Sequence, residues 1–151
     1  MKLFLGEYDH ALDDRGRITL PRKIRQELGQ ERELVLARGF DTCIFGFDLS
    51  SWEREAGKHL ETPVTDEKGR SLRRYLFSGA QKADIDKLGR ILLPAQLKEY
   101  ASISRNVAII GAGDHFEIWD KEQWRKYAVS HSDNGQRGHG KAPGSPREAI
   151  Y

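Results

Sequence analysis

Two short segments of the chain share the pattern Asp-x-x-Gly-Arg-Ile-x-Leu-Pro, which starts at Asp13 and again at Asp86. Asp accepts hydrogen bonds from nearby backbone amides and Gly tolerates a positive φ, so each copy predicts a tight turn. The turn is followed by an arginine, Arg17 or Arg90, four residues after the Asp. A guanidinium in this place can hydrogen-bond guanine O6 and N7 or bridge phosphates, and it can equally pair with the Asp before it. The residues alone leave both roles open.

Basic residues are denser around the first turn than around the second. Arg15 lies at the tip of the first turn, where the second carries Leu88, and Arg22, Lys23 and Arg25 follow shortly after it. Such residues suit phosphate contacts, which set affinity without reading sequence. Any single one of these basic residues could equally belong to an ordinary solvent-exposed surface without a role in binding. If the chain binds nucleic acid, we expect the first half to dominate.

Signals for catalysis are weak. Asp9, His10 and Asp14 could be acid–base or metal groups of a hydrolase, but no third ligand stands at metal spacing and an exposed turn does little to shift a pKa. Phosphate-binding loops, G-x-S-x-G elbows and dinucleotide fingerprints are absent from the sequence. The single cysteine, Cys43, lies in an apolar stretch, which predicts a small, buried hydrophobic residue rather than a nucleophile. We expect no enzyme activity, no cofactor and no metal.

The two motifs belong to a tandem duplication with a constant offset. Gly16 and Gly89 are 73 residues apart, and the same offset relates the apolar runs 34–36 and 107–109. A self-match that covers motif and hydrophobic pattern over roughly fifty residues indicates a repeat. Each half is expected to contain a strand, a turn, a strand, a short helix, a hairpin and a final helix.

The elements around the first turn can be placed by their patterns. Residues 4–12 and 17–20 are expected to form a hairpin with its tip at residues 14–16. Pro21 suits the first position of a short helix, which Gly29 ends.

Each half continues with a second hairpin and a helix. The first of these hairpins spans 34–37 and 43–47, and its counterpart spans 107–110 and 116–119. Ser50 with Glu53, as a capping box, should open the first helix, and Asp120 with Gln123 should open the second.

Composition favours one soluble body. Each half of the 151 residues is too short for a large core, so the halves should pack together. We divide the chain into a first half (1–60), a linker with an amphipathic segment (61–79), a second half (80–129) and a disordered tail (130–151). The net charge of +2 is weak support for nucleic-acid binding. No apolar run reaches membrane-spanning length, so we expect a cytoplasmic protein without a membrane partner.

The paired turns, together with Phe4-Leu5-Gly6-Glu7-Tyr8, Arg73-Arg74-Tyr75 and Glu117-Ile118-Trp119, carry a resemblance over Met1 to about Tyr127. The chain resembles the MraZ family of bacterial transcriptional regulators, whose halves are each related to the AbrB DNA-binding domain. The resemblance implies a mainly β fold with short helices, in which two pseudo-symmetric halves form a swapped-hairpin, AbrB-like β-barrel. It also implies a nucleoid-associated, ring-like homo-oligomer that binds double-stranded DNA at short G-rich direct repeats. These repeats would lie upstream of the division and cell-wall operon that includes the regulator's own gene, with repression as the expected effect.

The resemblance implies a role for each candidate residue. The expected DNA-binding residues are Arg15, Arg17, Arg22, Lys23, Arg25 and Arg90. The expected structural residues of the turns are Asp13, Gly16, Asp86 and Gly89. Arg73 and Arg74 are assigned to a subunit interface. The alternative is an oligomeric protein-binding scaffold in which the arginines form structural ion pairs. A steep salt dependence would distinguish DNA binding from it.

Overall fold

The computed structural model describes residues 1–137 of the chain. Its strands are β1 (Glu7–Ala11), β2 (Arg17–Thr19), β3 (Glu33–Arg38), β4 (Ile44–Phe47), β5 (Gln81–Asp84), β6 (Arg90–Leu92), β7 (Asn106–Gly111) and β8 (Phe116–Asp120). Its helices are α1 (Arg22–Leu28), α2 (Leu49–Leu60), α3 (Glu67–Gly79), α4 (Ala95–Tyr100) and α5 (Lys121–Arg137).

Six strands form one antiparallel sheet in the order β1-β7-β8-β4-β3-β5, and β2 pairs with β6 in a separate two-stranded ribbon. The sheet is open, because its edge strands β1 and β5 do not pair with each other. The expectation of a mainly β, swapped fold of two tandem halves is therefore confirmed, whereas the six strands do not close into a barrel.

The halves exchange strands. β1 of the first half pairs with β7 of the second, and β5 of the second half pairs with β3 of the first. The expected hairpin of residues 4–12 with 17–20 is therefore wrong in its pairing, although its turn forms. Turn chemistry fixes only the local backbone, and the partner of each arm is decided by the long-range ladder.

Other local predictions hold or shift by a few residues. The hairpins β3–β4 and β7–β8 are confirmed. Pro21 is the residue before α1 rather than its first residue, and Gly29 ends that helix with φ 67°. The capping box at Ser50 is wrong: α2 begins earlier, and the Asp48 carboxylate accepts the hydrogen bond from the Ser51 amide. At α5 the expected cap is present, with Asp120 accepting from the Gln123 amide at 3.2 Å.

A single hydrophobic core contains residues of both halves. Ile18 and Leu36 of the first half are packed in the same cluster as Ile91 and Ile109 of the second, and each is at most 1% exposed. The run 34–37 along β3 is buried at every residue, because the core covers one face of that strand and α3 packs near it as well. Cys43 is fully buried, as predicted. Neither half could bury these residues alone.

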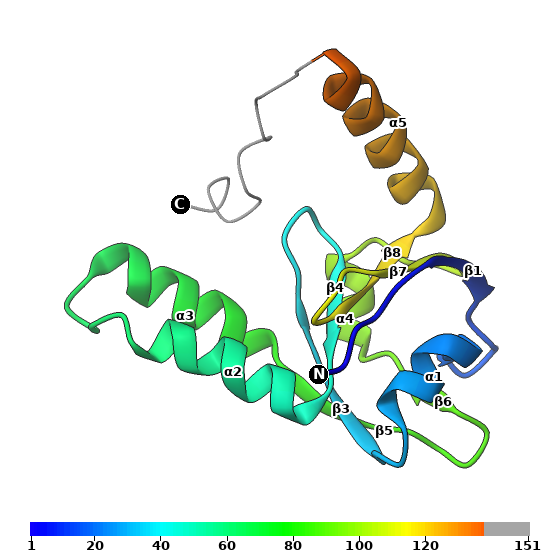
Figure 1. The fold of residues 1–151 in the computed structure, drawn as a ribbon, viewed down its shortest axis with the longest axis horizontal. Helices are drawn as coiled ribbons and strands as arrows, with labels where there is room; N and C mark the ends of the chain where they lie inside the picture. Colours follow the sequence, from blue (N-terminus) through cyan, green and yellow to red (C-terminus); the bar gives the residue numbers. More distant parts are fainter. Residues whose placement is uncertain (138–151) are drawn as a thin grey trace.

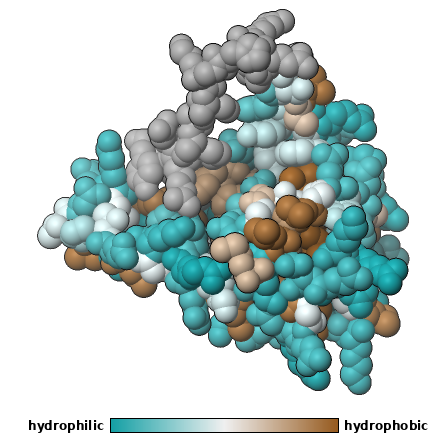
Figure 2. Space-filling model, in the orientation of Figure 1, coloured by the Kyte–Doolittle hydropathy of each residue, from teal (hydrophilic) through white to brown (hydrophobic). Residues whose placement is uncertain are grey.

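Helices α2 and α3 pack together as an arm that projects from the sheet, on the side away from α1 and β6 (Figure 1). Trp52 of α2 meets Phe77 of α3 edge-to-face, with ring centroids 5.9 Å apart. Figure 2 shows a mostly hydrophilic surface in this view, with apolar side chains near the centre and along the lower edge of the arm. Leu60 and Val64 at the end of the arm are more than half exposed.

Helix α5 continues past residue 130, where the expected tail begins, and is described as far as Arg137. The rest of the predicted tail, 138–151, lies outside the described residues. Of the helices within 1–137, none combines the length and the apolar character needed to cross a bilayer.

Candidate nucleic-acid interface

The first turn is built around the carboxylate of Asp13. Its Oδ1 accepts from the backbone amides of Arg15 and Arg17, both at 2.9 Å, and its Oδ2 accepts from Arg17 Nε at 2.9 Å. Gly16 has φ 79°, the left-handed region that favours glycine. The carboxylate therefore shapes the turn and holds the arginine side chain at the same time.

The second turn repeats this geometry. Asp86 Oδ1 accepts from the amides of Leu88 and Arg90 at 2.9 and 2.8 Å, and Oδ2 accepts from Arg90 Nε at 2.8 Å. Gly89 has φ 77°. The side chains of both arginines are 28% exposed. In both turns the aspartate is thus the partner of the arginine.

The same hydrogen bonds act on the two carboxyl groups. In each turn the backbone amide of the arginine is the largest cause that lowers the pKa of the aspartate, and the arginine side chain adds to it. Both carboxylates are therefore ionised at neutral pH and keep their arginines paired.

Each ion pair leaves part of the guanidinium free. Only Nε is used, and among the described residues neither terminal nitrogen of Arg17 or Arg90 has a hydrogen-bond partner. These two nitrogens form the fork that matches guanine O6 and N7 or a phosphate. An ion pair with Asp and a contact with DNA are therefore compatible at the same arginine.

The ribbon β2–β6 brings both arginines to one face. Arg17 lies opposite Leu92 and Thr19 lies opposite Arg90, whereas the central pair, Ile18 and Ile91, points into the core. Side chains on one face of an antiparallel pair are neighbours, and diagonal ones are about 7–8 Å apart. The two arginines therefore belong to one surface rather than to two separate sites.

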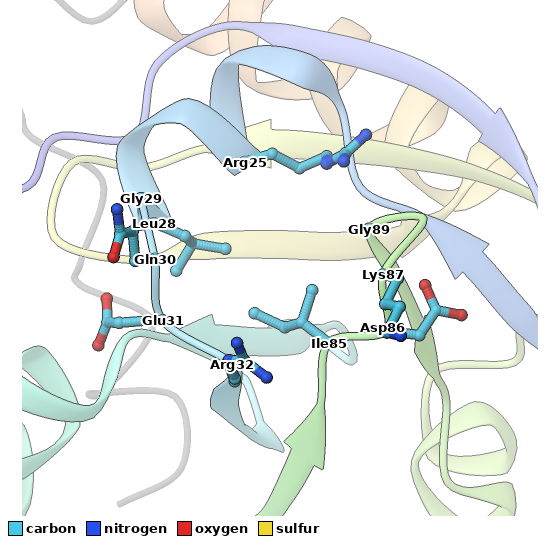
Figure 3. Close-up of a pocket in the computed structure, with 10 residues that line it drawn as sticks. All are labelled: Arg25, Leu28, Gly29, Gln30, Glu31, Arg32, Ile85, Asp86, Lys87 and Gly89. Atoms are coloured by element: carbon cyan, nitrogen blue, oxygen red, sulfur yellow. The ribbon is translucent and has the colours of Figure 1, made fainter.

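The halves also exchange the cations that lie over the turns. A Cβ added at Gly89 would meet the Arg25 guanidinium, so Arg25 of the first half lies over the second turn (Figure 3). Lys98 of the second half lies over the first turn, with Nζ 3.3 Å from the position of a Cβ at Gly16. Arg25 is thus not part of a first-half cluster, and the imbalance of charge that the sequence suggests is reduced.

The other predicted DNA-binding residues are exposed to solvent but do not lie on the ribbon β2–β6. Arg15 is exposed at the tip of the first turn, and Arg22 and Lys23 are exposed at the start of α1. Lys98 is not among the candidates that the sequence predicts. The offset of 73 residues that relates the repeats maps Arg25 onto Lys98, so the signal was present.

Strand exchange, a shared core and a ribbon with two carboxylate-bound arginines define a protein of two tandem, intertwined β halves. A family model described as "MraZ protein, putative antitoxin-like" matches residues 3–75 and again 76–139. The chain belongs to the MraZ family.

Curated relatives cover most of the chain. A protein of Syntrophomonas wolfei is 46% identical over 125 residues, which are 83% of this chain and 86% of the relative. One of Heliobacterium modesticaldum is 42% identical with the same coverage. One of Clostridium acetobutylicum is 41% identical over 131 residues, 87% of this chain and 91% of the relative. Each is named "Transcriptional regulator MraZ", which supports transcriptional regulation as the role of the family.

Proposed function

We propose that the chain is a sequence-specific DNA-binding transcriptional regulator that needs no cofactor. The observation that carries the proposal is the ribbon β2–β6, which presents Arg17 and Arg90 on one face with their terminal nitrogens free. The major groove admits a two-stranded β-ribbon, and an arginine fork on guanine is the commonest specific contact there. Diagonal positions on such a ribbon are about 7–8 Å apart at the backbone, which corresponds to roughly two base-pair steps of ~3.4 Å.

The turns add affinity around this reading surface. Arg15, Arg22, Lys23 and Arg25 are exposed basic residues near the two ends of the ribbon and serve as phosphate contacts. Contacts of this kind position the protein, while the two arginines on the ribbon select guanine-rich sequence.

We further propose assembly into a ring-like homo-oligomer. The projecting α2–α3 arm with exposed Leu60 and Val64, and with Arg74 exposed on α3, supports an interface between copies there. Several ribbons in one assembly would bind direct repeats with avidity, so that individually weak contacts suffice. The site of action is the nucleoid, at G-rich repeats upstream of the division and cell-wall operon that includes the chain's own gene, where binding represses transcription.

The test is fluorescence anisotropy on the DNA upstream of the gene and on a shuffled sequence of the same composition, over a salt series. Wild type should prefer the upstream DNA, with affinity falling by about one log–log unit per phosphate contacted. Arg17→Ala should reduce the preference while its size-exclusion profile stays that of wild type. Equal binding of both DNAs, or none, refutes the proposal.

A second function is favoured by one observation, the ion pairs Arg17–Asp13 and Arg90–Asp86. They fit a protein-binding scaffold in which the arginines serve only the turns. In that case Arg17→Ala would destabilise the fold without changing DNA binding.

A further inference from the structure

A pocket of about 310 Å³ lies between the end of α1, the loop that follows it and the second turn (Figure 3). Leu28 and Ile85 form its apolar floor, and the other lining residues are polar, charged or glycine. Its size is at the lower end of pockets that hold small molecules.

Three cations line this pocket. Figure 3 shows Arg25 reaching from α1 toward the second turn, with Arg32 on the other side of the apolar floor and Lys87 beside the turn. Within residues 1–137 none of these three side chains forms an ion pair or a hydrogen bond. All three residues are exposed.

The two carboxylates of the pocket are fewer than its three cations, and within residues 1–137 each forms its ion pair with a different residue. Asp86 holds Arg90 at 2.8 Å, and Glu31 lies 3.0 Å from Lys2 Nζ. The pocket therefore carries unpaired positive charge, which favours an anionic ligand.

The duplication shows that the pocket is not an inevitable result of the fold. Gln30 lines it, and the residue 73 positions later is Ile103, which is 8% exposed and packs in the core. By contrast, the pocket residue Arg32 has an arginine, Arg105, at the equivalent position of the second half. The first half thus has a polar, exposed side chain at a position that the second half uses to fill space.

We infer that this pocket binds the phosphate group of a small anionic molecule. Arg25 and Arg32 supply planar donors that suit phosphate oxygens, and Lys87 supplies a third charge. The apolar floor of Leu28 and Ile85 suits a ligand that is larger than a bare ion.

Bound ligand would also act on the second turn. Arg25 lies against Gly89, so a ligand that binds this guanidinium competes with a DNA phosphate for it at the end of the ribbon. This second effect rests on the proposed DNA-binding function, whereas binding in the pocket does not.

Isothermal titration of the full chain with inorganic pyrophosphate, in a buffer without phosphate, tests the pocket. Wild type should bind saturably. Arg32→Gln should weaken binding on the order of tenfold or more, since charge-assisted hydrogen bonds are lost. The matched control is Arg105→Gln, which makes the same change in net charge in the other half and should bind as wild type does.

Gln30→Ile places the side chain of the second half in the first and leaves the charge unchanged. It should abolish pyrophosphate binding with an unaltered circular dichroism spectrum. Absence of saturable binding to wild type, or equal loss in Arg32→Gln and Arg105→Gln, overturns the inference.

A second arm separates free phosphate from the DNA backbone as the source. At constant ionic strength, pyrophosphate should weaken binding of wild type to upstream DNA and leave Gln30→Ile unaffected. If Gln30→Ile itself lowers DNA affinity and pyrophosphate does not bind, the pocket receives a backbone phosphate and the small-molecule inference fails. If pyrophosphate binds but no DNA does, the pocket stands and the proposed function fails.

Discussion

The first and second turns have the same internal construction and different surroundings. Both fix an arginine with one carboxylate, through hydrogen bonds of 2.8–2.9 Å at equivalent atoms. The tip is Arg15 in one and Leu88 in the other, and the cation above is Lys98 in one and Arg25 in the other. The comparison shows that the duplicated halves keep what orients the arginine and vary what surrounds it. Four predictions test how far the two turns are equivalent in function.

The largest effect is expected from removing each arginine of the ribbon. Arg17→Ala and Arg90→Ala should each lower affinity for the upstream DNA by roughly 5- to 150-fold, the value of one bidentate base contact. Because the two side chains share one face, their losses should agree within about threefold, as measured by anisotropy. A loss confined to Arg17→Ala would show that the first half dominates, as the sequence suggests.

The next effect separates orientation from charge. Asp13→Asn removes the partner of Arg17 and should lower specific affinity by about three- to tenfold, although it makes the protein more basic. Asp14→Asn is the matched control: Asp14 is exposed, and it has the same charge. Its affinity should equal or slightly exceed that of wild type. If both variants bind more tightly, only net charge matters at this turn.

A smaller effect is expected at the tips. Arg15→Leu gives the first turn the tip of the second, and Leu88→Arg does the reverse. The first change should reduce the slope of log affinity against log salt by about one unit, and the second should increase it by about one. Discrimination between upstream and shuffled DNA should stay the same in both. A change in discrimination would show that the tips read bases.

The smallest effect concerns stability in acid. The pKa of Asp13 and that of Asp86 are lowered in the fold from 3.8. Each therefore adds stability that is present above pH 3.8 and is lost as the pH falls through the lowered value. In wild type, Tm should fall between about pH 5 and pH 2 as these carboxylates take up protons. The slope of Tm against pH in this range should be smaller in Asp13→Asn and in Asp86→Asn than in wild type, by the same amount in both. Unequal slopes would show that the two turns differ in strength.

Much of this comparison is visible in the sequence because the turns are local. The Asp, the Gly and the Arg lie within five residues, and the chemistry that joins them needs no distant partner. The repeat offset then places the second turn. The hairpins β3–β4 and β7–β8 were predictable for the same reason, since each pairs neighbouring segments.

What sequence could not provide is the exchange between halves. The turn at residues 14–16 favours pairing of its own two arms, yet the first arm pairs with β7, almost a hundred residues later. For that reason the sequence groups Arg25 with the first turn, whereas in the fold it lies over the second. The pocket was not predictable either, because its lining combines residues 25–32 of the first half with residues 85–89 of the second.

The exchange of strands has a consequence for synthesis of the protein. The Leu93 amide donates to the Gly16 carbonyl, and the Leu20 amide donates to the Gly89 carbonyl, so the ribbon β2–β6 cannot form until residue 93 has left the ribosome. β1 waits longer, until β7 has emerged. At about 5–20 residues per second, the nascent first half exposes unpaired strand edges for several seconds. The two arginines therefore come to share one surface only after the second half has been synthesised as far as β6, and the sheet is completed only after β7.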